Sequence, residues 1–64
     1  MLVPGMMSFE VYTRRGRGRQ YHGTVPAVSS IDAAWYWFAL HPHTKRVLVR
    51  PEDSRDKLLA YRRK

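Results

Sequence analysis

The chain has 64 residues, with twelve Lys and Arg against five Asp and Glu, a formal net charge of +7 and no cysteine. A chain of this length forms one domain and buries only about 60% of its unfolded surface, so a second copy of the chain would add stability. The lack of cysteine excludes disulfides and thiolate metal sites, and it fits a reducing cytoplasm.

Residues 1–7 are apolar and contain Pro4-Gly5, and they have no basic segment of the kind that begins a signal peptide. We expect them to form a flexible N-terminal tail, followed by a single small basic domain over residues 8–64. The longest nearly apolar run in the chain has about ten residues, half of what a membrane-spanning helix needs.

Residues 8–15 alternate in polarity, which predicts a strand with Phe9 and Val11 on one face and Glu10, Tyr12 and Arg14 on the other. The segment Gly16-Arg17-Gly18 predicts a hairpin turn, because glycine adopts the positive φ that a reversal requires. Residues 19–25 predict a second strand, with Tyr21 and Val25 on the apolar face and Gln20, His22 and Thr24 opposite. Gly23 inside this strand indicates a bulge or a close neighbour.

Residues 31–40 carry both tryptophans and predict a helix. Ser29 and Ser30 are candidate N-caps, Asp32 suits the positive end of the helix, and Pro42 ends it. The helix has two apolar stripes, formed by Ile31, Ala34, Trp35 and Phe38 and by Ala33, Trp37 and Leu40. We expect Trp35 and Phe38 to pack on the sheet. The second stripe packs against the C-terminal segment or a second copy, so Tyr36, Trp37 and Leu40 are candidates for a homodimer interface.

Residues 45–50 predict a third strand with Val47 and Val49 inward, and residues 53–63 predict a second helix capped by Asp53 or Ser54. The expected fold is therefore a small α+β domain of the form β-β-α-β-(α). Its three-stranded sheet would have the order 2-1-3, with the helix 31–40 packed on one face.

The basic residues flank an apolar centre, since residues 21–43 contain no Lys or Arg. Four of them, Arg14, Arg15, Arg17 and Arg19, alternate with glycine at the predicted hairpin turn; we call residues 14–19 the arginine hairpin. Guanidinium groups bind phosphate oxygens in pairs and stack on bases, so this pattern favours nucleic-acid binding. The alternative is a solvated turn whose charges prevent edge-to-edge pairing of strands.

The predicted sheet face without the helix carries Arg46 and Arg50, and Lys45 lies just before them. Tyr12 and His22 on the same face are candidates for stacking on bases, although an ordinary solvated sheet face has the same composition. His22, His41 and His43 are possible metal ligands, but no thiolate or acid completes a tetrahedral set, so no metal site is predicted. The five acids are scattered, and no phosphate-loop or dinucleotide pattern occurs, so we expect neither an enzyme nor a cofactor.

These features predict a small accessory protein that binds DNA or RNA through phosphates, using Arg14, Arg15, Arg17, Arg19, Lys45, Arg46 and Arg50. The alternative is a protein-interaction module, an adaptor or inhibitor whose basic face engages an acidic protein. In this alternative the aromatic helix could join two copies of the chain as a homodimer.

Overall fold

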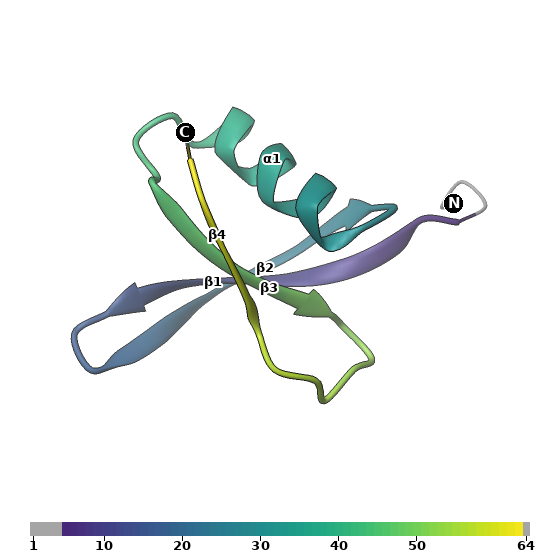
Figure 1. Cartoon of the computed structure of the whole chain (residues 1–64), viewed down its shortest axis with the longest axis horizontal. Coiled ribbons are helices and arrows are strands. Elements are labelled where there is room, and N and C mark those ends of the chain that lie inside the picture. Colours follow the sequence, from purple (N-terminus) through teal and green to yellow (C-terminus); the bar gives the residue numbers. More distant parts are fainter. Residues whose placement is uncertain (1–4, 64) are drawn as a thin grey trace.

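The computed structural model describes residues 5–63, which form two strands, a helix and two further strands (Figure 1). The elements are β1 (Met7–Arg15), β2 (Gly18–Ala27), α1 (Ser30–Leu40), β3 (Arg46–Pro51) and β4 (Leu59–Arg62). The sheet order is β2-β1-β3-β4, and every neighbouring pair is antiparallel. Figure 1 shows α1 lying across one side of the twisted sheet. We call this side the helix face and the other side the open face.

The expected α+β architecture is confirmed, and so is the pairing of the first three strands, but the sheet has four strands rather than three. The helix predicted over residues 53–63 is wrong, because this segment forms a loop and then β4. The Ser54 hydroxyl accepts a hydrogen bond from the Asp56 N–H at 2.9 Å, as an N-cap serine would. The same local bond stabilises a turn, so it does not distinguish a turn from a helix. The predicted tail over residues 1–7 falls mainly on residues 1–4, which lie outside the described residues, and Met7 begins β1.

The predicted hairpin and bulge are both confirmed. Gly16 has φ 58° at the turn, and the register of β1 and β2 shifts between Val11 and Tyr12, opposite Gly23 with φ 120°. The bulge reverses the two faces of β2 before Gly23. Tyr21 therefore lies opposite Tyr12 on the open face, and its predicted place on the apolar face is wrong.

The core lies between α1 and the helix face of the sheet. It consists of nine buried side chains: Phe9, Val11, Val25, Ala27, Ala33, Ala34, Phe38, Val47 and Val49. Phe38 is buried as predicted, at 2% exposure, but Trp35 is 46% exposed, so its predicted core position is wrong. The small side chains of Ala33 and Ala34 face the sheet and place Trp35 on the flank of the helix. There its ring meets that of Phe38 edge to face, with centroids 5.7 Å apart.

Both ends of α1 are held by side chains. The Ser29 hydroxyl accepts from the Asp32 N–H at 3.3 Å, which confirms the predicted N-cap. Beside it, the Ser30 and Tyr61 hydroxyls are 2.6 Å apart and join β4 to the start of the helix. At the other end, Arg63 donates to the carbonyl oxygens of Phe38 and His41, at 2.6 and 3.0 Å. A cation here satisfies free carbonyls and the negative end of the helix dipole.

Candidate functional site

The alternation of the strands places a row of arginines on the open face. Phe9 and Val11 point into the core, so Arg14 lies on the opposite side of β1, where its register partner in β2 is Arg19. Val47 and Val49 likewise turn Arg46 to the open face of β3, where its partner in β4 is Arg62. We call these the two arginine pairs. Like charges directly opposite each other in a sheet are destabilising.

Among residues 5–63, no acid forms an ion pair with either arginine pair. Between residues 5 and 63, the single ion pair joins Glu10 to Arg50, with Nε and Oε1 2.7 Å apart. The excess positive charge at the two pairs is therefore available to an external anion.

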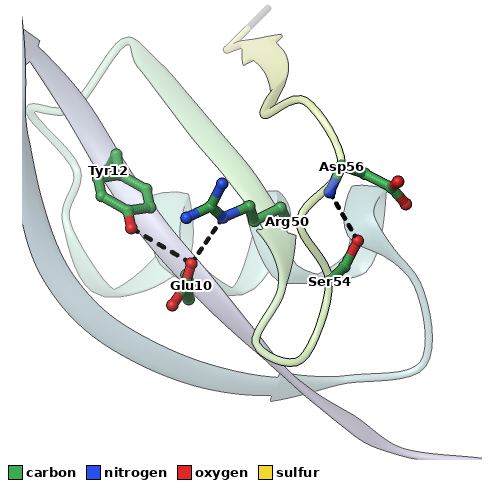
Figure 2. A network of polar contacts seen from close by, with 5 residues as sticks. All are labelled: Glu10, Tyr12, Arg50, Ser54 and Asp56. Atoms are coloured by element: carbon green, nitrogen blue, oxygen red, sulfur yellow. Dashed lines mark hydrogen bonds and ion pairs between the residues drawn. The ribbon is translucent and has the colours of Figure 1, made fainter.

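The Glu10–Arg50 ion pair also orders the centre of the open face (Figure 2). The Tyr12 hydroxyl donates to the same Glu10 oxygen at 3.2 Å, and the guanidinium carbons of Arg19 and Arg50 lie 5.3 and 5.8 Å from the Tyr12 ring centroid. The hydrogen bond from Arg50 is the main cause that lowers the pKa of Glu10, and the bond to Glu10 is the main cause that raises the pKa of Arg50. Arg50 thus has its counterion within the fold. Figure 2 shows its guanidinium turned toward Glu10 and Tyr12, with the Asp56 carboxylate pointing the other way.

Two adjoining grooves lie along the arginines. The large groove, of about 550 Å³, separates the hairpin turn from the loop before β4 and is lined by Arg14, Arg17, Gly18, Arg19, Leu48, Arg50, Arg55, Asp56, Lys57 and Leu58. The small groove, of about 250 Å³, is lined by Arg14, Arg46, Val47, Leu48, Ala60, Tyr61 and Arg62. Arg14 and Leu48 line both grooves, so the two grooves lie side by side. Among the described residues, Asp56 is the only acid that lines either groove.

The structure brings together four of the seven predicted binding residues: Arg14, Arg17, Arg19 and Arg46. Arg50 is close by but paired with Glu10. Lys45 is exposed next to Arg46, in a shallow depression that Arg62 and Arg63 share. Arg15 lies on the other side of β1 from Arg14, where its Nη1 donates to Gln20 at 3.4 Å. Gln20 is opposite Thr13, so its predicted open-face position is wrong.

Of the two candidate stacking residues, Tyr12 lies on the open face and His22 does not. The His22 Nε2 is 2.7 Å from the Thr13 hydroxyl, and its ring centroid is 5.4 Å from that of Trp37 in the helix. The predicted open-face position of His22 is therefore wrong, because the bulge carries it to the helix face. Tyr21 takes the open-face position in its place and is 53% exposed.

Sequence reasoning missed three basic residues of the site: Arg55, Lys57 and Arg62. All three were assigned to the C-terminal helix that does not form. The alternation of Leu59, Ala60, Tyr61 and Arg62 is the signal for a strand, but four residues are too few to outweigh a capping pattern.

The three candidate interface residues differ in exposure. Tyr36 and Leu40 are exposed side chains of α1, at 45% and 57%. Trp37 packs against the core, and its ring is stacked on that of His41 with centroids 4.0 Å apart. The homodimer itself stays a prediction.

Within residues 5–63, no helix is long and apolar enough to cross a membrane, and no three His, Asp or Glu side chains gather to hold a metal ion. No protein family, curated protein or solved structure matches the chain. The chemistry of the open face is therefore what indicates a function.

Proposed function

We propose that the protein binds nucleic acid through the phosphate backbone, using the open face and Arg17 at the hairpin turn. The observation that carries this proposal is the two arginine pairs, Arg14–Arg19 and Arg46–Arg62, aligned across neighbouring strands without an acidic partner among the described residues. Such pairs weaken a sheet, and neutral residues there would make it more stable. A row of phosphates would neutralise them, since each guanidinium binds two anionic oxygens at once.

Further basic side chains extend the same surface. Arg17 at the hairpin turn and Arg55 and Lys57 in the facing loop line opposite walls of the large groove. The net charge of +7 draws a polyanion toward the molecule before contact. A target of spaced single carboxylates would leave most of this row unneutralised, so a phosphodiester chain fits better than a scattered acidic surface.

The salt dependence of binding tests the proposal. If about five phosphates are neutralised, the logarithm of the association constant should fall against log[salt] with a slope near −4.5 for duplex DNA and −3.5 for a single strand. Fluorescence anisotropy of a labelled oligonucleotide measures this slope. Arg14→Ala should flatten it by about one unit, and Arg14→Ala with Arg62→Ala by about two, because one phosphate contact is lost with each arginine.

Arg15→Ala is the matched control, because it removes the same charge from the next residue but from the other side of β1. It should leave the slope within about half a unit of the original value. If neither DNA nor RNA binds at about 50 mM salt, the proposal fails. The two arginine pairs would then be assigned to an acidic protein partner.

A further inference from the structure

A second row of residues crosses the open face beside the arginines. Tyr12 is the register partner of Tyr21 in β2 and of Leu48 in β3, and Leu48 is the partner of Ala60 in β4. These four uncharged residues cross all four strands, and we call them the neutral row. The arginines Arg19, Arg14, Arg46 and Arg62 occupy the next position on the same face of each strand, two residues along the chain. This corresponds to about 7 Å along the strands.

The row of arginines suits the phosphate of a nucleotide, and the neutral row suits its base. A strand whose phosphates lie on the arginines would carry its bases over the neutral row. Leu48 lines both grooves and Ala60 lines the small one, so apolar surface continues between the basic walls. In a duplex the faces of the bases are already stacked on one another, and only phosphates and groove edges are presented. The neutral row therefore offers contacts to an unpaired strand that a duplex cannot use.

The shape of the protein also disfavours a duplex. A two-stranded ribbon reads B-DNA by entering the major groove, which is about 12 Å wide. The shortest dimension of this domain is 17 Å, so only the arginine hairpin could enter. Arg55 and Lys57, in the loop before β4, line the large groove together with that hairpin. A duplex on the hairpin would therefore have to clear this loop before it reached the neutral row.

Tyr12 and Tyr21 differ in their contacts and in their exposure. Tyr12 has two guanidiniums over its ring and its hydroxyl bonded to Glu10, so it holds Arg19 and Arg50 in place. Tyr21 is 53% exposed, and its ring centroid is 5.2 Å from that of Tyr12. It is the more accessible ring of this pair, and aromatic rings of this kind stack on bases of any sequence.

From these observations, and resting on the proposed function, we infer that the ligand is an unpaired nucleic-acid strand, bound across the open face with its phosphates on the arginines and a base stacked on Tyr21. Recognition depends on stacking and phosphates, so it is tolerant of sequence.

Three labelled probes of equal length, about 12 nucleotides, test this inference by fluorescence anisotropy at one salt concentration: a thymidine strand, the same strand in a duplex, and an abasic strand with phosphates only. The thymidine strand should bind at least about tenfold more tightly than the other two. Tyr21→Ala should weaken its binding by about 5- to 150-fold, the loss of one stacked base, and leave the salt slope unchanged. Tyr21→Phe should bind like the unaltered protein.

Tyr36→Ala is the matched control, since it removes a tyrosine of similar exposure, 45% against 53%, from the helix on the other side of the sheet. It should leave all three affinities unchanged, and circular dichroism verifies that each variant is folded. If the three probes bind equally and Tyr21→Ala has no effect, the inference is overturned while phosphate binding stands. If no probe binds, the proposed function fails with it.

Discussion

Arg63→Ala tests whether the C-terminal end of α1 depends on one guanidinium. The Arg63 Nε donates to the Thr44 carbonyl oxygen at 2.9 Å, and Nη2 donates to those of Phe38 and His41. The guanidinium carbon also lies 4.9 Å from the centroid of the Phe38 ring. A hydrogen bond to a charged group contributes about 1.5–3 kcal/mol when well buried. Arg63 is half-buried and two of its bonds share one nitrogen, so we expect a loss of about 2–3 kcal/mol in total.

Such a loss is a large part of the stability of this domain, which is about 3–10 kcal/mol for its length. The midpoint of thermal unfolding should fall by about 10–20 °C, measured by far-UV circular dichroism, with urea unfolding as the independent assay. Arg62→Ala is the control, because it removes the same charge one residue earlier, from the open face. It should change stability by less than about 0.5 kcal/mol or raise it slightly, since it relieves the repulsion from Arg46. Equal effects of the two variants would refute the assignment of Arg63 as the helix cap.

Three further predictions follow from the packing and the charges. Phe38→Ala should cost about 3–5 kcal/mol in urea unfolding and Trp35→Ala only about 1 kcal/mol, and equal costs would place Trp35 in the core. Arg50 lowers the pKa of Glu10, so the ion pair stabilises the fold above pH 4.5 and is lost as the pH falls below that value. An NMR titration of Glu10 should show its pKa return toward 4.5 in Arg50→Ala, and no change would contradict the pairing. If the predicted homodimer forms through α1, Leu40→Glu should dissociate it in light scattering, and a monomeric unaltered protein at high micromolar concentration would reject it.

The parts of the fold that were predicted correctly are those with local signals. Ser29 and Asp32 mark the start of α1, and Gly16 and Gly23 mark a turn and a bulge, because each signal acts within a few residues of itself. The place of Trp35 was not predictable in this way. It depends on how closely α1 approaches the sheet, which is set by Ala33 and Ala34 together with the residues across from them.

The candidate site was predicted in part for the same reason. Arg14, Arg19 and Arg46 lie on the open face because strand alternation is a local rule. The bulge at Gly23 was expected, but its effect on the faces of β2 exchanged the positions of Tyr21 and His22. Arg62 belongs to the site only because β4 pairs with β3, and four residues carry too weak a strand signal to predict a long-range pairing.

The arginines of this domain have opposite effects on its stability on the two faces of the sheet. On the helix face, Arg63 neutralises the end of α1 and stabilises the fold. On the open face, the two arginines within each arginine pair repel each other. A polyanion that binds the folded open face would remove this repulsion and stabilise the fold by mass action, by about 2.7 kcal/mol when its concentration is a hundred times the Kd. The same arginines that weaken the free domain would therefore make the bound domain the more stable state.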